Sequence, residues 1–300
     1  MTGIKPAVSV IVPAYRAWEA LPRCLDALRK QSGGVAFETI VVASGEVAAE
    51  APLAARFPEV RFLLSAGRRF PGAARNLGAQ VARGDIFLFL DADCALAKDG
   101  LARVVAGHAQ HAAPVIGGCA DQGETATGAG WGYYFASVAP WLVRPADEPI
   151  PVPDLATPCY SIKRWAFERY GPFAEARYCE DTLLCWQIQA AGHALLLDPG
   201  LRVRHDGIDA LGPVLRRKFR HGAAFAVLRA QTQGWGWARR RWQALGAPLV
   251  PWVLLYRIGR AVSQAGCYRR RFWLSLPYTA LAVLAWALGE AVGLWFGAVD

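Results

Sequence analysis

Between residues 8 and 110, short β-branched apolar runs alternate with stretches of helical period. This alternation constrains the fold more than any other feature of the chain. The runs at 8–12, 39–42, 60–64 and 86–90 are predicted strands, and 21–30, 72–82 and 98–110 are predicted helices. Strands that alternate with helices favour a mostly parallel sheet with helices on both faces, so the predicted fold class is α/β. Ligands of such sheets bind beyond the carboxyl ends of the strands, where polar residues are the first candidates for function.

Composition excludes several other classes of protein. Hydrophobic residues make up 54% of the 300 residues and charged residues 19%, which rules out global disorder. The seven cysteines are odd in number and form no Cys-x-x-Cys pair, so neither a disulfide framework nor a zinc ribbon is expected. The apolar run before Pro13 is too short for a secretory signal, and we therefore expect a cytosolic catalytic part.

The net charge of +9 comes from one block of the chain. Residues 1–200 hold 18 Lys/Arg and 20 Asp/Glu, residues 201–271 hold 15 and 2, and residues 272–300 hold none and 2. A basic block can bind nucleic acid or anionic lipid headgroups. Because this block leads directly into an apolar, Trp-rich tail, we predict that it faces lipid and that nucleic acid is not a partner.

Two carboxylates follow the fourth predicted strand. Asp91 and Asp93 come directly after the apolar run 86–90. At a strand end, their oxygens can hold Mg²⁺ or Mn²⁺ beside a diphosphate. Taken alone, the tripeptide is more often a solvated turn than a metal site.

A second motif precedes this strand. Pro71-Gly72 is expected to begin a helix whose free N–H groups point outward, and Arg68, Arg69 and Arg75 add positive charge. Such a helix start attracts an anionic ligand. An ordinary helix with exposed arginines is the alternative.

The order of these motifs resembles that of the family-2 inverting glycosyltransferases, which have the GT-A fold. The resemblance spans about residues 7–230 and rests on four elements at plausible spacing. These are Val8-Ser9-Val10-Ile11-Val12-Pro13-Ala14-Tyr15, Ala74-Arg75-Asn76-x-Gly78, Gly84-Asp85 leading to Phe89-Leu90-Asp91-Ala92-Asp93, and Glu180-Asp181.

The resemblance implies a nucleotide-sugar donor, most commonly a UDP-sugar, and a divalent metal, Mn²⁺ or Mg²⁺. It places the donor beside Pro13, Ala14, Tyr15, Ser44, Arg75 and Asp91. It also implies that Asp93 binds the metal and that His205 reaches the metal or the diphosphate. For His205, a structural role after a strand is the alternative.

The resemblance further implies that Asp181 is the general base, and that Cys159, Tyr160 and Glu180 border the acceptor. An apolar pattern of helical period follows Asp181 and ends at Gly192, so Asp181 is expected to start a helix. The helix dipole there would favour the ionised carboxylate. A capping acid without catalytic function is the alternative.

One position departs from the family pattern. Ala43 ends the second predicted strand where the family places one or two aspartates, and it cannot accept a hydrogen bond. We rank three explanations in order: Ser44 and backbone groups replace the contact, the nucleotide is not the usual uridine, or donor binding has been lost.

The C-terminal tail is long enough to cross a bilayer. Residues 273–298 carry one charge, at Glu290, and exceed the roughly 20 residues that a crossing needs. We expect this segment to be inserted in the membrane. The alternative is a hydrophobic helix buried against the catalytic domain or a partner subunit. Arg269, Arg270 and Arg271 precede the segment and favour a cytoplasmic location for that end.

The segment before the tail differs in character. Residues 245–256 contain Pro248 and Pro251 and favour an interfacial or re-entrant helix. Within the tail, Gly289, Gly293 and Gly297 recur every four residues on one helix face, which permits close helix packing and a homo-oligomer.

These observations predict a GT-A domain at 1–210, a basic helical linker at 211–243 and membrane-associated helices at 244–300. The expected protein is a metal-dependent inverting glycosyltransferase at the cytoplasmic face of the cell membrane, which acts on a lipid-linked or polysaccharide acceptor. A sugar-nucleotide transferase of similar fold and a non-catalytic membrane-binding protein are the alternatives.

Overall fold

The computed structural model describes residues 5–45, 50–123, 127–145 and 148–297. The chain forms two compact units, the first from residues 1–121 and 146–205, and the second from 122–145 and 206–300. The boundary near residue 205 lies close to the expected one at 210. The assignment of 122–145 to the C-terminal unit was not expected.

Within the described residues, the first unit is built on a nine-stranded sheet. Its strands are β1 Val8–Tyr15, β2 Phe37–Ser44, β3 Val60–Ser65, β4 Ile86–Phe89, β5 Cys94–Leu96, β6 Val115–Gln122, β7 Ile150–Val152, β8 Tyr160–Lys163 and β9 Leu195–His205. Its helices are α1 Leu21–Arg29, α2 Glu50–Arg56, α3 Pro71–Val81, α4 Gly100–Gln110, α6 Arg164–Tyr170 and α7 Glu180–Ala190.

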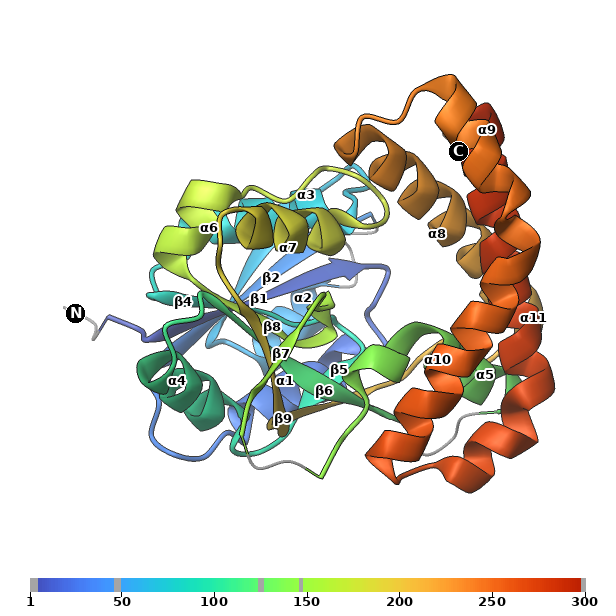
Figure 1. The fold of residues 1–300 in the computed structure, drawn as a ribbon. Coiled ribbons are helices and arrows are strands. Elements are labelled where there is room, and N and C mark those ends of the chain that lie inside the picture. Colours follow the sequence, from blue (N-terminus) through green and yellow to red (C-terminus); the bar gives the residue numbers. More distant parts are fainter. Residues whose placement is uncertain (1–4, 46–49, 124–126, 146–147, 298–300) are drawn as a thin grey trace. The chain divides into compact units, whose positions relative to one another are not determined.

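The sheet confirms the predicted α/β class. Its order is β3-β2-β1-β4-β8-β6-β9-β5, with β7 paired to β9. The strands β3, β2, β1 and β4 are parallel, and α3 covers one face of the sheet while α1 and α4 lie on the other (Figure 1). β1, β2 and β4 are apolar runs buried by helices, as expected for a parallel sheet, whereas the edge strand β3 is only partly buried.

Antiparallel pairing extends the sheet beyond β4. β8 pairs with β4 and β6, and β9 pairs with β5 and β7, all antiparallel. These strands were not among the predicted ones, although the end of β9 was anticipated at His205. The extension matters for function because it carries residues 94 and 205 into neighbouring positions.

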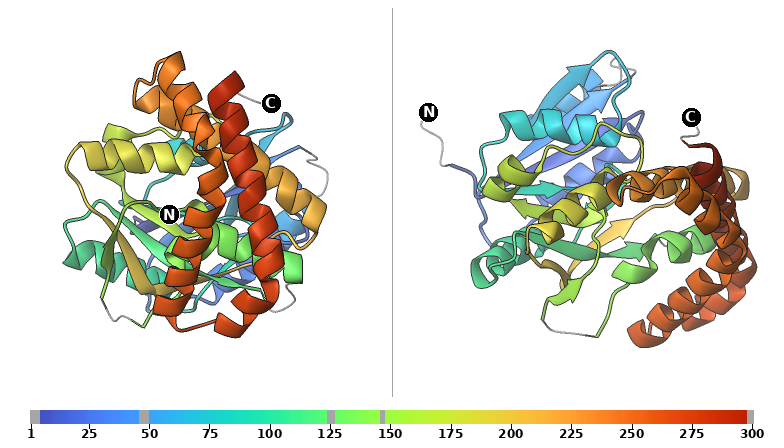
Figure 2. Two further views of the ribbon diagram at one scale, coloured as in Figure 1. Left: turned by 45° about the vertical axis from the view of Figure 1, so that its right-hand side comes forward. Right: turned by 45° about the horizontal axis from the view of Figure 1, so that its top comes forward.

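The second unit is helical. It contains α5 Gly128–Val138, α8 Leu211–Thr232, α9 Trp237–Leu245, α10 Val250–Ala265 and α11 Arg269–Phe296. Figure 2 shows α10 and α11 side by side, as part of a hairpin. Aromatic contacts join α5 to α11, with the Phe135 and Phe272 rings 5.3 Å apart. These contacts explain why residues 122–145 fold with the C-terminal unit.

Glycines allow α8 and α11 to pack with their backbones in close approach. A Cβ atom added to Gly289 would collide with the carbonyl oxygen of Phe219, and one added to Gly293 with that of Ala223. A Cβ on Gly222 of α8 would meet the backbone of α11 in the same way. Two of the three glycines predicted to permit close packing therefore serve an intramolecular contact, and that face is not available to a second copy.

α11 is also the helix among the described residues that is long and apolar enough to cross a membrane. Just under half of its most apolar 18-residue window, 44%, is buried inside the protein. The predicted helix is thus confirmed, and it is packed against other helices on one side only.

The close packing of α8 on α11 predicts how the addition of a single methyl group changes the free energy of unfolding. Gly289→Ala should lower the free energy of unfolding by about 1–3 kcal/mol, because the backbone of α8 cannot move aside without separating the helices. Gly259→Ala on α10 is the matched control, since its Cβ would lie 3.9 Å from the Phe272 ring. The control should be neutral or stabilising by up to about 1 kcal/mol. Thermal unfolding of both variants checks the difference, and equal stabilities would contradict the close helix contact.

Candidate active site

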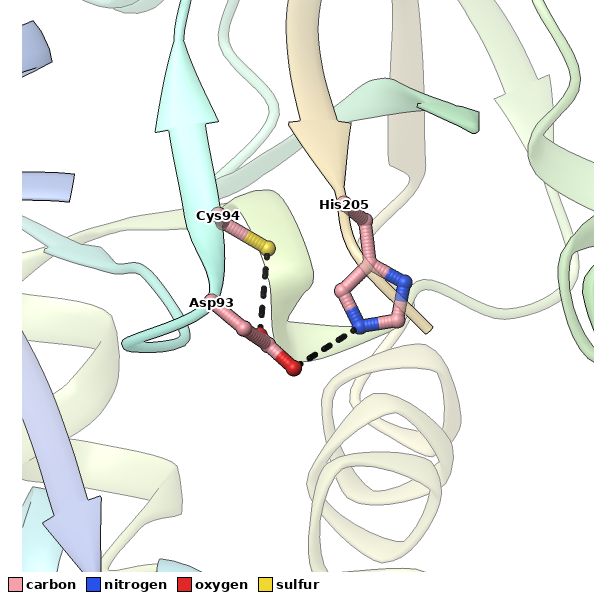
Figure 3. Close-up of side chains that lie close together, drawn as sticks. All are labelled: Asp93, Cys94 and His205. Atoms are coloured by element: carbon pink, nitrogen blue, oxygen red, sulfur yellow. Dashed lines mark hydrogen bonds and ion pairs between the residues drawn. The ribbon is translucent and has the colours of Figure 1, made fainter. Parts of the chain in front are cut away.

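The pairing of β5 with β9 brings a carboxylate and an imidazole together. Cys94 lies opposite His205 in the ladder, and Asp93 directly precedes it. The Asp93 Oδ2 atom lies 3.5 Å from His205 Nε2. Figure 3 shows both side chains directed toward each other from the ends of the two strands. Residues that the sequence separates by more than a hundred positions thus form one potential metal site.

These two side chains have the chemistry of a divalent metal site. The ligand atoms of Asp93, Cys94 and His205 lie within 4.8 Å of one another. Cys94 is buried, and burial, together with Asp93 and Asp91, raises the pKa of its thiol well above the ordinary value. A neutral thiol is a poor ligand for a hard cation, whereas a carboxylate with an imidazole suits Mn²⁺ better than the all-oxygen set that Mg²⁺ prefers.

A buried arginine joins the two acidic motifs. Arg75 on α3 is 2% exposed, and its Nη1 donates to Glu180 Oε1 at 2.7 Å while its Nη2 donates to Asp91 Oδ1 at 2.8 Å. Burial lowers the pKa of Arg75, but Asp91, Glu180 and Asp181 outweigh this effect and raise it. The guanidinium therefore stays charged and fixes the end of β4 relative to the start of α7.

The neighbouring residues of α3 hold the segment that leads to α7. Asn76 Nδ2 donates to the carbonyl of Phe173 at 2.8 Å, and Asn76 Oδ1 accepts from the Phe173 N–H at 2.9 Å. Gly72 leaves room for the backbone at Ala174, because a Cβ at this position would collide with its carbonyl oxygen. The Ala74-Arg75-Asn76 motif thus positions the segment that carries Glu180 and Asp181.

This arrangement changes the expected role of the α3 start. Arg75 was predicted to contact the donor, but both ends of its guanidinium bind protein carboxylates. The carbonyl of Ala174 lies over Gly72, where an anion was expected. The structure therefore shows Arg75 as a residue that orients two carboxylates of the site.

Asp181 lies in the first turn of α7, as predicted. Its Oδ1 accepts from the Thr182 N–H at 2.8 Å, and its Oδ2 lies 3.3 Å from the Thr157 N and 3.4 Å from the Thr157 hydroxyl. Burial raises the pKa of Asp181, although Arg75 and these N–H groups oppose the rise. Burial thus opposes the helix dipole, which was expected to favour the ionised carboxylate. A raised proton affinity is compatible with a general base.

Two residues of this site have no counterpart in the sequence predictions. Thr157 donates to Asp181, and Asp154 accepts from the Thr182 hydroxyl at 3.4 Å. Burial and the nearby Asp181 raise the pKa of Asp154 to about 7. Both lie in the Gly- and Pro-rich stretch where no periodicity indicates an element, so only the fold reveals them.

The predicted nucleotide side of the site is formed by the ends of β1 and β2. Tyr15 pairs with Ser44 in register and is 39% exposed, and the Arg68 guanidinium lies 4.6 Å from its ring centroid. Ala14 and Ser44 are buried, and the Ser44 hydroxyl accepts from the Arg69 N–H at 3.4 Å. Of Pro13, Ala14 and Tyr15, the tyrosine offers the most accessible surface for a base.

Ala43 is also buried, at 1% exposed, and it pairs with Ala14. The Ser44 hydroxyl already binds the backbone of Arg69, so a replacement contact from Ser44 to a base would have to share this oxygen. Glu46, the next acidic residue, lies outside the described residues.

Two predicted acceptor residues are corrected by their burial. Cys159 is 1% exposed and Tyr160 is fully buried. Both belong to the core: the Tyr160 ring packs beside Phe89 and Phe173, and the Cys159 sulfur lies beside Gly118. Their side chains cannot contact an acceptor, whereas Glu180 lies at the site through its ion pair with Arg75.

The fold and these residues define a protein of the GT-A class. Residues 9–171 match the family described as Glycosyl transferase family 2, which is more than half of the chain. The chain therefore belongs to glycosyltransferase family 2. The matched segment includes Arg75, Asp91 and Asp93, while Asp181 and His205 lie beyond it.

Three similar proteins are named as glycosyltransferases or as biosynthesis proteins. The chain is 31% identical over 123 residues to glycosyltransferase AglE of Haloferax volcanii, covering 39% of this chain and 40% of the relative. It is 34% identical over 102 residues to the succinoglycan biosynthesis protein ExoO of Rhizobium meliloti, covering 33% and 29% of the two chains. It is 36% identical over 99 residues to the amylovoran biosynthesis glycosyltransferase AmsB of Erwinia amylovora, covering 31% and 33%. The matches thus span well under half of each relative.

Solved structures share the fold at low identity. The mannosyltransferase PcManGT of Pyrobaculum calidifontis, in complex with GDP-Man and Mn²⁺, has a TM-score of 0.63 at 20% identity and matches 97% of this chain and 88% of its own. GalNAc-T7 with UDP, GalNAc and Mn²⁺ has a TM-score of 0.56 at 19% identity and matches 67% and 44%.

The buried Arg75 bridge predicts a non-additive pair of substitutions. Arg75→Met should lower the free energy of unfolding by about 3–5 kcal/mol, because it leaves Glu180 and Asp91 without their cation. Adding Glu180→Gln should recover part of this loss, since the amide needs no counter-charge. Urea unfolding of the parent, both single variants and the double variant gives the coupling energy, and simple additivity would show that the ion pair has little weight.

Proposed function

We propose that this protein is an inverting glycosyltransferase that transfers a sugar from a nucleotide-sugar donor to a hydroxyl group of a lipid-linked or nascent polysaccharide acceptor. The reaction takes place at the cytoplasmic face of the membrane and uses a divalent metal, for which the ligand set favours Mn²⁺.

The observation that carries the proposal is the link from Asp91 through Arg75 to Glu180. It fixes the strand end that bears Asp91 and Asp93 next to the helix start that bears Asp181. Displacement at an anomeric carbon requires two components. One is an acidic region that binds a metal and the diphosphate, and the other is a separate carboxylate that accepts a proton.

The similar proteins support the donor and the setting. PcManGT was solved with GDP-Man and Mn²⁺, and GalNAc-T7 with UDP and Mn²⁺. ExoO and AmsB are named for polysaccharide biosynthesis. We extend a nucleotide-sugar donor and a glycan acceptor to this chain on these grounds.

In the proposed reaction, Asp181 accepts the proton of the acceptor hydroxyl as its oxygen bonds to the anomeric carbon. The bond between that carbon and the diphosphate oxygen breaks on the opposite side, so the configuration inverts. Thr157 and the Thr182 N–H hold the carboxylate of Asp181 in one orientation. The aromatic face of Tyr15, with Arg68 beside it, provides a surface for the nucleotide base.

Asp93 and His205 would hold the metal. When bound, such a cation neutralises the charge that develops on the leaving diphosphate. The side chain of Asp93 is 40% exposed, which leaves ligand positions open to oxygens of the donor.

A donor panel tests the proposed function directly. Full-length protein is incubated with UDP- and GDP-sugars, Mn²⁺ and membrane extract, and the released nucleotide is identified. A nucleoside diphosphate is expected. Pyrophosphate would indicate a sugar-nucleotide transferase instead, and the absence of turnover and of donor-induced thermal shifts would indicate a non-catalytic protein.

Substitution of the proposed base should separate binding from chemistry. Asp181→Asn should lower kcat by roughly 10²- to 10⁴-fold with little change in donor affinity, because the amide keeps the shape but cannot accept the proton. Glu175→Gln, an exposed change in the segment before α7, is the control and should leave kcat unchanged. Turnover of the Asp181 variant within threefold of the parent would exclude the base assignment.

Metal binding can be measured without turnover. Asp93→Ala and His205→Ala should each weaken Mn²⁺ binding at least tenfold in calorimetry or electron paramagnetic resonance, because each removes one protein ligand. Asp85→Ala at the start of β4 is the control, since this exposed carboxylate pairs with Lys5. Unchanged Mn²⁺ affinity in both site variants would remove the metal assignment while leaving the base assignment open to its own test.

A further inference from the structure

Exposed apolar side chains are concentrated in the C-terminal unit. Among the described residues, 19 large hydrophobic side chains are exposed, and 15 of them lie between Trp237 and Phe296. Several of these side chains are largely exposed to solvent, with Trp242 at 73% and Trp252 at 72%. Such a concentration marks an interaction surface, because soluble surfaces rarely leave so many large apolar groups in one region.

On α11 the exposed apolar residues form one stripe. Leu274, Leu281, Leu288 and Trp295 recur every seven residues and are all at least 42% exposed. The 3.6-residue period places them together on one side of the helix, and this side differs from the one on which Gly289 and Gly293 pack against α8. α11 therefore has one side buried in the protein and one side that the described part of the chain leaves exposed.

The buried side prevents α11 from crossing a bilayer as an independent helix. α5 covers its first half, and α8 runs beside its second half, where Ala282 packs with Val214 and Leu294 with Ala226. α8 carries the exposed Arg216 and Arg217. A crossing by α11 would place these charges at membrane depth, where charged side chains are strongly disfavoured.

The helices beside α11 have the composition of a membrane–water interface. Trp237 and Trp242 on α9, and Trp252 and Tyr256 on α10, are exposed next to arginines. Eight arginines occur between residues 237 and 296, and all except Arg240, which is half-buried, are exposed. The one acidic residue in that range, Glu290, is buried and paired with Arg229. This charge is complementary to anionic lipid headgroups, and it would repel a second copy of the same surface.

An apolar groove lies on this unit between α9 and α11. It has a volume of about 360 Å³ and is lined by Ala244, Leu245, Ala291, Val292, Trp295 and Phe296. Arg241 lies 5.1 Å from the ring centroid of Trp295, beside the groove. A hydrocarbon chain in the groove would thus have a cation next to it that can meet a headgroup phosphate.

We infer that the C-terminal unit docks on an anionic lipid bilayer in the plane of the interface, with the outward stripe of α11 and the exposed residues of α9 and α10 inserted and α11 not crossing. This inference deepens the proposed function by specifying how the enzyme meets a membrane-borne acceptor. Only the functional role given to the docking rests on the proposed function, because lipid binding itself is measured without donor or acceptor.

The first test measures binding of the full chain to phosphatidylcholine vesicles with and without phosphatidylglycerol. Phosphatidylglycerol should strengthen binding, and replacing Arg269, Arg270 or Arg271 by Gln should weaken it about fivefold for each arginine. Leu281→Ser with Leu288→Ser should weaken it by more than about tenfold. Trp165→Ser is the control, because Trp165 is 45% exposed on the N-terminal unit. Equal binding of the stripe and control variants, or dimerisation in place of vesicle binding, would overturn the inference.

The second test determines whether α11 crosses. Single cysteines at Ser263 and Phe296, in a Cys267→Ser background, are labelled in intact cells and in inverted vesicles with an impermeant maleimide. Because the other six cysteines are buried, labelling reports the C-terminal end of α11 at Phe296 and, at Ser263, the end of α10 that leads into α11. Both positions should be protected in intact cells and labelled in inverted vesicles. Labelling of Phe296→Cys from outside the cell would show a crossing. A protein that docks in plane but lacks turnover would refute the proposed function and leave this inference standing.

Discussion

The charge of Arg75 is the constraint on which the site depends. A guanidinium buried to this degree is tolerable only when both of its ends are paired, since an isolated buried charge is strongly disfavoured. Its two partners, Asp91 and Glu180, come from elements 89 positions apart, so the ion pair can form only when β4, α3 and the start of α7 have their native arrangement. Asn76 and Gly72 support the same arrangement through backbone contacts that involve no charge. Folding and the assembly of the site are therefore one event.

The sequence predicted the parallel half of the sheet and missed most of the antiparallel half for a physical reason. β1, β2 and β3 are runs of six to eight residues with an apolar centre, and a stretch of helical period follows β1 and β3. β5 and β7 have three residues each, which is too short for a period to be recognised, and β6 and β8 flank the Gly- and Pro-rich stretch in which no periodicity is recognised. Their pairing depends on partners far along the chain, and local patterns carry no information about such partners.

The same distinction between local patterns and long-range contacts applies to the residues of the candidate site. Asp91 and Asp93 could be found because a strand end is a local feature, and Asp181 because a helix start is one. The role of Arg75 could not be assigned, since its type and position fit an anionic ligand as well as a protein carboxylate. Thr157 and Asp154 lie in a segment whose structure is determined by what it packs against, and Cys159 and Tyr160 were misassigned because burial there is a property of the fold.

The tail shows why composition alone cannot distinguish a helix that crosses a membrane from one that lies on it. A mean hydropathy over α11 includes both Ala282 and Leu281 in the same way, although Ala282 packs on α8 and Leu281 is exposed. The glycines that permit the close α8–α11 contact also commit one side of the helix to the protein. What remains exposed on α11 is mainly a stripe of leucines with Trp295, and in the proposed docking this stripe lies at the boundary between lipid and the folded protein. In that proposal, the arrangement of side chains around the helix axis, and not the length of the helix, decides how the chain would bind a membrane.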